Sequence, residues 1–171
     1  MKINSKNNKR LVTKVFQDVS KKYDLMNDIM SLGVHRIWKK KFVDWLNPQI
    51  NTKLLDVASG TGDIAKLYLE KINYNGEAYC LDENEDMLNL NKKKFKNTNN
   101  INWFCNNAED LPFEDNYFDY YTISFGIRNV ENIDNALSEA YRVLKPGGRF
   151  LCLEFSKVKN DFLNKIYKIY S

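Results

Sequence analysis

The chain has 171 residues, of which 43% are hydrophobic and 13% aromatic, a composition that supports one folded domain and excludes a disordered chain. Its formal net charge of +4, from 26 basic and 22 acidic residues, is too small to indicate nucleic-acid binding. No apolar run approaches the roughly 18 residues of a membrane span, and the lysine- and asparagine-rich beginning lacks the apolar region of a secretory signal. We therefore expect a cytoplasmic protein without a membrane span.

Apolar residues recur at helical spacing through the first third of the chain, which predicts amphipathic helices over residues 1–50 that cover a cofactor or a substrate. The pattern is carried by Val12, Val15, Phe16, Val19, Tyr23, Met26, Met30, Trp38, Phe42 and Trp45. Residues 39–41 are a run of lysines beside the last three of these. The run suits contact with an anionic membrane surface or an ordinary solvated helix face, and both interpretations stay open.

Strands and helices alternate through residues 51–171, which predicts an α/β fold with a doubly wound parallel sheet. The strands are expected at residues 54–57, 77–82, 101–105, 118–125 and 149–155. Helices are expected at 64–72 and 84–95, and a third helix presents one face made of Ala136, Leu137, Ala140, Tyr141 and Leu144. Residues 145–148 (KPGG) predict a turn that ends this helix.

The first strand runs into a turn containing Gly60 and Gly62, and a helix begins near Asp63. These glycines fit the dinucleotide-binding fingerprint, with Asp82 about 20 residues further on, so a NAD-dependent oxidoreductase is one interpretation. A pyrophosphate at this helix N-terminus would meet the negative charge of Asp63, which is unfavourable. The ammonium and sulfonium of S-adenosylmethionine instead complement Asp56 and Asp63, while the glycine amides take its carboxylate. The sequence favours S-adenosylmethionine, and Asp63 also suits a helix-capping role.

Further polar residues follow the other predicted strands, at the edge of the sheet where ligands bind. Asp82 follows the second strand and suits hydrogen bonds to a ribose. Asn107 and Ala108 follow the third strand and suit an adenine edge, and Ser124 ends the fourth.

Metal and nucleophile chemistry is not indicated. Cys80, Cys105 and Cys152 each lie in an apolar run, so we expect small, buried, reduced side chains, and their spacing suits no metal site. His35 is the only histidine, which argues against a zinc site or a serine-histidine pair.

Six motifs together resemble the ubiquinone/menaquinone biosynthesis C-methyltransferases (UbiE-type), a class I S-adenosylmethionine-dependent family. They are residues 23–28 (YDLMND), 59–63 (SGTGD), 107–109 (NAE), 124–129 (SFGIRN), 142–148 (RVLKPGG) and 153–156 (LEFS). The resemblance implies a Rossmann-like fold in which Thr61, Asp82, Asn107, Ala108 and Ser124 contact S-adenosylmethionine. Family members continue beyond the position of Ser171 through further helices and two last strands, so we expect residues 51–171 to form a cofactor-binding core without those strands.

The resemblance also implies a substrate, the reduced ring of a prenylated benzoquinone or naphthoquinone precursor, which is methylated on a ring carbon. Such a transfer needs an electron-rich ring, so Arg128 is the candidate that stabilises a phenolate-like ring through charge-assisted hydrogen bonds. Arginine stays protonated and is a poor base. Asn129, Tyr23 and His35 are candidates to assist the removal of the proton.

A prenylated quinol lies in a membrane, so the expected partners are the membrane surface or a quinone-synthesis assembly, with no nucleic acid and with a homodimer left open. The protein is expected in the cytoplasm or peripherally on the inner face of the cytoplasmic membrane. A nucleic-acid or protein methyltransferase is disfavoured because residues 124–128 (SFGIR) differ from the Asn/Asp-Pro-Pro-aromatic segment of exocyclic-amine methylation. A non-catalytic cofactor-binding component of the assembly is disfavoured by Arg128 and Asn129.

Overall fold

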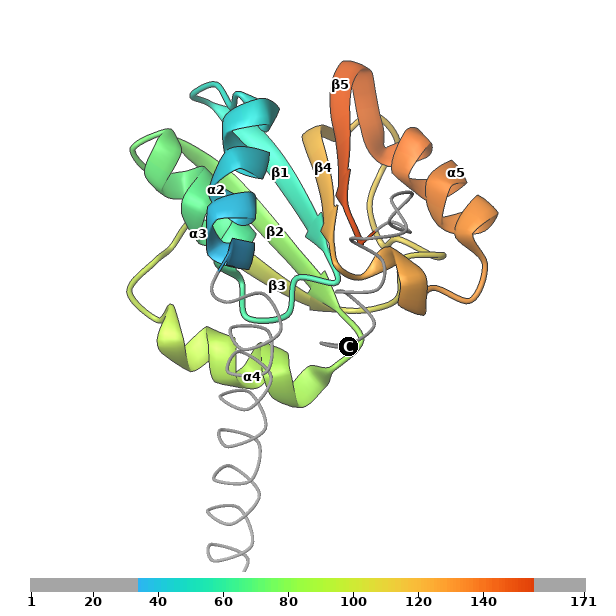
Figure 1. Cartoon of the computed structure of the whole chain (residues 1–171), viewed down its shortest axis with the longest axis horizontal. Helices are drawn as coiled ribbons and strands as arrows, with labels where there is room; N and C mark the ends of the chain where they lie inside the picture. Colours follow the sequence, from blue (N-terminus) through green and yellow to red (C-terminus); the bar gives the residue numbers. More distant parts are fainter. Residues whose placement is uncertain (1–33, 156–171) are drawn as a thin grey trace, which may run out of the picture.

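The computed structural model describes residues 34–155, and predictions that involve earlier residues, Tyr23 among them, lie outside this range. Five strands form one parallel sheet in the order β3-β2-β1-β4-β5, with helices between them (Figure 1). In chain order the elements are α2 (Val34–Leu46), β1 (Thr52–Val57), α3 (Asp63–Lys71), β2 (Gly76–Asp82), α4 (Glu85–Lys94), β3 (Ile101–Cys105), β4 (Phe118–Ser124), the 3-10 turn η1 (Ile127–Asn129), α5 (Ile133–Val143) and β5 (Leu144–Leu153).

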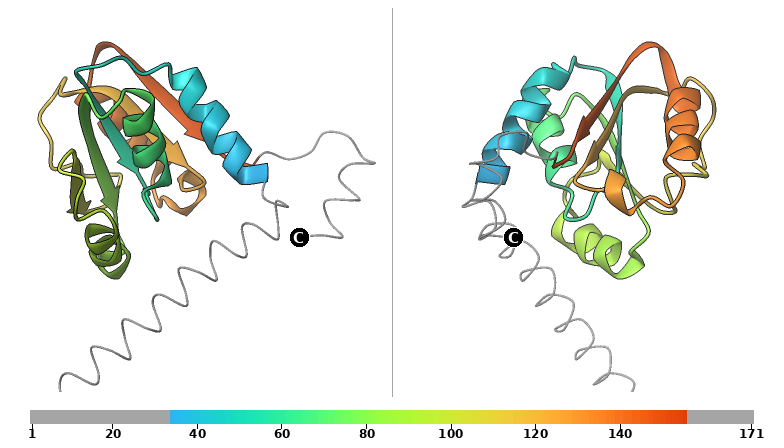
Figure 2. Two further views of the ribbon diagram at one scale, coloured as in Figure 1. Left: turned by 90° about the vertical axis from the view of Figure 1, so that its left-hand side faces the viewer. Right: turned by 45° about the vertical axis from the view of Figure 1, so that its right-hand side comes forward.

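Helices cover both faces of the sheet, as the alternating pattern predicts. Figure 2 shows α2 and α3 on one side of the sheet and α5 on the other. The central strand β1 supplies both cores: Leu54 packs in the cluster beneath α2 and α3, and Leu55 packs in the cluster beneath α5. Because both faces of β1 are buried, the adjacent residues Leu54 and Leu55, which point to opposite faces, are both apolar. The prediction of a doubly wound parallel sheet is confirmed.

The face that α5 buries agrees with the predicted one at Ala136 and Ala140 but not at Leu137 and Tyr141. Ala136, Ala140 and Val143 face the sheet and are almost fully buried, whereas Leu137 is 43% exposed and Tyr141 85% exposed. Two neighbouring stripes of apolar residues satisfy the helical period on this segment. The small alanine side chains face the sheet, so the larger residues of the other stripe lie outward.

Residues 145–148 do not form a separate turn between α5 and the last strand. Strand β5 begins at Leu144, directly after α5, and its pairing with β4 shifts register around this segment, because Leu144 lies opposite Phe118 while Arg149 lies opposite Tyr120. The extra residues form an irregular bulge, in which Gly147 adopts a positive φ of 81°. The predicted helix-ending turn is therefore an interruption within a strand.

Two further expectations need correction. Cys80 is buried, and its burial raises the pKa of its thiol, but Cys105 and Cys152 are exposed because they lie on the outermost strands of the described sheet. On α2, Phe42 is buried as expected, yet Trp45 is 74% exposed. No helix within residues 34–155 is long and apolar enough to cross a membrane.

Candidate cofactor site

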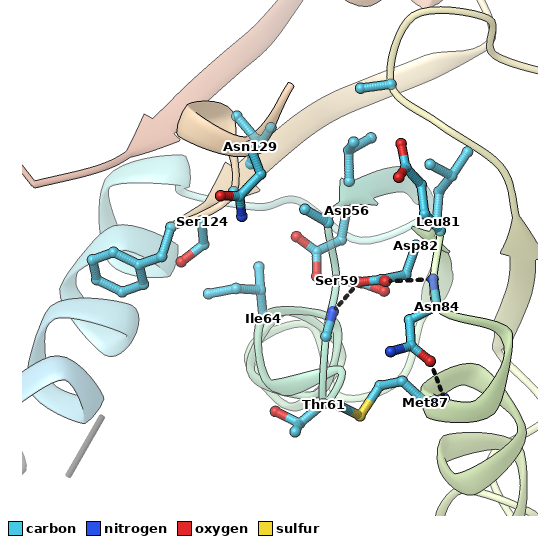
Figure 3. A pocket seen from close by; sticks show the side chains of 18 of the residues that line it. Asp56, Ser59, Thr61, Ile64, Leu81, Asp82, Asn84, Met87, Ser124 and Asn129 are labelled. Atoms are coloured by element: carbon cyan, nitrogen blue, oxygen red, sulfur yellow. Dashed lines mark hydrogen bonds between the residues drawn. The ribbon is translucent and has the colours of Figure 1, made fainter. Parts of the chain in front are cut away.

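A pocket of about 370 Å³ lies at the carboxyl ends of the central strands (Figure 3). Each strand from β1 to β4 contributes a residue at its end or in the loop that follows, as expected for a doubly wound sheet. Of the residues predicted to bind the cofactor, those that line this pocket are Asp56, Gly60, Thr61, Asp63, Asp82, Ala108 and Ser124. The structure thus brings together residues that lie far apart in the sequence.

The glycine turn between β1 and α3 is held by hydrogen bonds within the protein. Gly60 and Gly62 have positive φ angles of 49° and 74°. The N–H of Gly60 donates to Oδ2 of Asp82 at 2.8 Å, and the N–H of Gly62 donates to the carbonyl oxygen of Ser59 at 2.9 Å. Both amides already have acceptors within the protein, and their role toward a ligand carboxylate stays a prediction.

The two glycines are expected to differ when replaced by alanine. A Cβ at Gly62 would lie 2.8 Å from Cη2 of Trp103, whereas a Cβ at Gly60 has nothing within 4 Å. Gly62→Ala combines backbone strain with a clash and should lower the free energy of unfolding by about 3 kcal/mol. Gly60→Ala adds only strain, about 1 kcal/mol, and its methyl group narrows the space left for a ligand. Urea unfolding measures the free energy of unfolding of both variants. A larger decrease for Gly60→Ala than for Gly62→Ala would contradict the expected clash with Trp103.

Asp56 is a buried carboxyl group at the end of β1. Its Oδ1 accepts a hydrogen bond of 2.8 Å from the hydroxyl of Thr122, while Oδ2 is buried without a hydrogen-bond partner among residues 34–155. Burial raises the pKa of Asp56 to about 7, and the bond from Thr122 only partly offsets this. The hydroxyl oxygens of Ser59 and Ser124, which line the same pocket, also lack partners in the described part of the chain. Unused polar atoms around a cavity fit a polar, cationic ligand.

Asp63 begins α3 and is paired with a lysine from α2. The distance from Nζ of Lys39 to Oδ2 of Asp63 is 2.9 Å, and the side chain of Lys39 is only 17% exposed. Burial acts to raise the pKa of Asp63, but the charges of Lys39 and Lys94 outweigh it, and the pKa lies below its usual value. Lys39 also lines the pocket. The sequence alone does not indicate this role, because a run of three lysines on a helix does not show which one turns inward.

Asp82 and Asn107 both fix loops at the ends of strands. Asp82 accepts the N–H of Gly60 with one oxygen and the N–H of Asn84 with the other, at 2.8 and 3.0 Å (Figure 3). A carboxylate has further lone pairs, so it can still accept a bond from a ligand. Asn107 accepts two backbone N–H groups, from Glu109 and Asp110, and lies in an adjoining shallow pocket instead of the main one. Its role as a cofactor ligand stays a prediction.

Two of the predicted catalytic residues, Arg128 and Asn129, lie beyond the end of β4, and the third, Tyr23, is outside the described residues. Asn129 lines the pocket, while Nη1 of Arg128 lies 2.6 Å from Oε1 of Glu154, which follows β5. Arg128 is therefore already paired with a carboxylate. Beside them the ring of Phe125 stacks on that of Phe155, with centroids 4.8 Å apart. This end of the sheet offers aromatic surface next to an ion pair.

The comparisons with known proteins agree with this architecture. The model of the ubiE/COQ5 methyltransferase family matches residues 2–171. The ubiquinone/menaquinone biosynthesis C-methyltransferase UbiE of Rickettsia prowazekii is 54% identical over 167 residues, which cover 94% of this chain and 67% of that protein. The mitochondrial 2-methoxy-6-polyprenyl-1,4-benzoquinol methylase of Dictyostelium discoideum is 46% identical over 200 residues, covering 99% of this chain and 64% of that protein.

Solved structures agree in fold. A SAM-dependent methyltransferase from Aquifex aeolicus superposes with a TM-score of 0.65 at 22% identity, over 72% of this chain and 66% of that one. The fold is thus the Rossmann-like fold of class I methyltransferases, as the resemblance implied. The chain spans about two thirds of the length of the Rickettsia relative. Fold and sequence together show that this chain belongs to the ubiE/COQ5 methyltransferase family.

Proposed function

We propose that this protein transfers a methyl group from S-adenosylmethionine to a ring carbon of a prenylated benzoquinol or naphthoquinol. The observation that carries the cofactor assignment is the pair of carboxylates, Asp56 and Asp63, at the glycine turn. A pyrophosphate there would meet two acidic groups, whereas a cationic ligand finds partners for its charge. The substrate class is that of the relatives, a ubiquinone/menaquinone biosynthesis C-methyltransferase and a 2-methoxy-6-polyprenyl-1,4-benzoquinol methylase.

Residues of the pocket suit the separate parts of the cofactor. Asp56 and Asp63 face the end that carries the sulfonium and the ammonium, Asp82 accepts from a ribose hydroxyl, and Ala108 lies where an adenine ring needs an apolar contact. When bound, S-adenosylmethionine supplies an electrophilic methyl group. The chain itself holds the cofactor in place and orients its methyl group toward the ring carbon.

Activation of the ring belongs to the far side of the pocket. Arg128 stabilises the developing negative charge on a ring oxygen, and Asn129 orients that oxygen by a hydrogen bond. The pairing of Arg128 with Glu154 keeps the guanidinium in one place. We place the encounter with substrate at a membrane surface or in a quinone-synthesis assembly, and the exposed Trp45 on α2 supports contact with a membrane surface.

The cofactor assignment is tested by thermal unfolding with S-adenosylmethionine and, as a comparison, with NADH. S-adenosylmethionine at about 100 times its dissociation constant should add roughly 2.7 kcal/mol to the free energy of unfolding, a shift of about 5–10 °C for a chain of this size. NADH should leave the midpoint unchanged. A higher unfolding midpoint with NADH alone would overturn the assignment of S-adenosylmethionine and would favour the oxidoreductase interpretation.

The substrate assignment is tested by transfer of a labelled methyl group to a reduced demethylated quinol. Label should appear in the quinol extracted into organic solvent, and mass spectrometry should locate it on a ring carbon. Label in nucleic acid or protein, with none in quinol, would show that the chain modifies another class of acceptor.

A further inference from the structure

The two glycine N–H groups expected to bind the carboxylate of the cofactor's amino-acid end are already hydrogen-bonded within the protein. The N–H groups of Gly60 and Gly62 already donate to Asp82 and to the carbonyl oxygen of Ser59. The described residues that line the pocket include one cationic side chain, that of Lys39. A ligand carboxylate in this pocket therefore has one charged donor to bind.

Lys39 is positioned for this task by the packing of α2 against α3. Phe42, Val43 and Leu46 bury one face of α2 in the core, next to residues of α3. Lys39 lies one turn before Val43 on the same face. Its side chain is 17% exposed and ends 2.9 Å from Asp63. The neighbouring Lys40 is exposed, so of these two lysines only Lys39 is turned to the pocket.

We propose that Lys39 is the ligand of the cofactor's carboxylate, and that the Lys39–Asp63 ion pair opens into two ion pairs when S-adenosylmethionine binds. The amino-acid end of the cofactor carries an ammonium and a carboxylate on one carbon. Asp63 exchanges Lys39 for the ammonium, and Lys39 exchanges Asp63 for the carboxylate. Each protein charge keeps a partner throughout, so neither is left unpaired in a partly buried place. The inference rests on the proposed function for the identity of the ligand.

Two other roles for Lys39 predict different behaviour. A lysine that only blocks the free pocket competes with the cofactor's ammonium for Asp63, so its removal would tighten binding. A lysine that only tethers α2 to α3 affects stability, and its removal would weaken all ligands of the pocket alike. Removal of a lysine that binds the carboxylate weakens only the ligands that have one.

The experiment compares S-adenosylmethionine with its decarboxylated form, which keeps the ammonium, the sulfonium and the adenosine. Titration calorimetry measures both ligands on the unchanged chain, Lys39→Met, Lys39→Arg, Asp63→Asn and the control Lys40→Met. Lys39→Met should weaken S-adenosylmethionine at least about tenfold, the value of one charge-assisted hydrogen bond, and should bind the decarboxylated form at least as tightly as the unchanged chain does, because Lys39 no longer competes with its ammonium for Asp63. Lys39→Arg should retain most of the affinity for S-adenosylmethionine, and Lys40→Met should match the unchanged chain.

Asp63→Asn should weaken both ligands, because both keep the ammonium. Binding of the decarboxylated form to Lys39→Met also shows that the variant is folded. The role of Lys39 would be overturned if Lys39→Met lost affinity equally for both ligands. It would also be overturned if this variant bound S-adenosylmethionine as tightly as the unchanged chain or more tightly. If the unchanged chain bound neither ligand, the proposed methyltransferase function would fail instead, so the two failures are distinguishable.

Discussion

Asp56→Asn is expected to raise the free energy of unfolding at pH 8 by about 2–4 kcal/mol while weakening S-adenosylmethionine binding at least tenfold. Asp56 is buried, and its pKa rises from 3.8 to about 7. Above pH 7 the folded protein therefore holds a buried carboxylate with one oxygen unpaired. An amide removes this charge, and its oxygen can keep the hydrogen bond from Thr122.

The sign of the pH dependence follows from the direction of this shift. A carboxyl group whose pKa is raised in the folded state contributes stability below its unfolded pKa, near pH 4. That contribution is lost as the pH rises through about 7. The gain from Asp56→Asn should be present at pH 8 and absent at pH 4. Urea unfolding at both values measures it, with the exposed Asp110→Asn as control. A gain of equal size at both pH values would contradict a titrating Asp56.

Arg128→Met is expected to lower kcat by about 10²-fold, with the dissociation constant of S-adenosylmethionine unchanged. Removing one donor that stabilises an oxyanion typically costs this much. The guanidinium lies 2.6 Å from Glu154, so part of the loss comes from leaving that carboxylate unpaired. Single-turnover methylation of a demethylated quinol gives the rate, and calorimetry gives the affinity.

A double variant separates the two contributions. If Arg128 acts on the ring, Arg128→Met combined with Glu154→Gln stays as slow as Arg128→Met alone. If Arg128 serves only to neutralise Glu154, the double variant recovers most of the rate, which would remove Arg128 from the catalytic residues. Glu114→Gln, in an exposed loop, controls for the loss of an acidic residue.

The layout of the sheet was predictable because each strand carries a local signal. Periodicity located β3 to the residue and β1, β2 and β4 within two residues, whereas β5 begins five residues before its predicted start. The stripe that α5 buries was not predictable, since two stripes have the same period. The bulge at residues 145–148 was missed because a Pro-Gly-Gly segment has the local signature of a turn, whereas pairing with β4 continues the strand.

The site was predictable where it follows the ends of strands, as for Asp56 and Asp82. Contacts between segments far apart in the sequence were not predictable. Lys39 on α2 pairs with Asp63 on α3, and Arg128 in η1 pairs with Glu154 after β5. Neither pairing has a local signature in the sequence. The use of the Gly60 amide by Asp82 likewise depends on the spacing of two loops. Such pairings depend on how elements pack, which periodicity does not record.

The strand order has a consequence for folding. Strand β1 pairs with β2, its neighbour in the chain, and with β4, so Asp56 and Thr122 meet across 66 residues. The loop that joins β1 to β4 costs more entropy to close than the loop that joins β1 to β2. We expect β1, β2 and β3 to assemble before β4 and β5 are added, and the pocket straddles the junction between β1 and β4. The pocket is thus completed late in folding, when a segment far along the chain joins the first three strands.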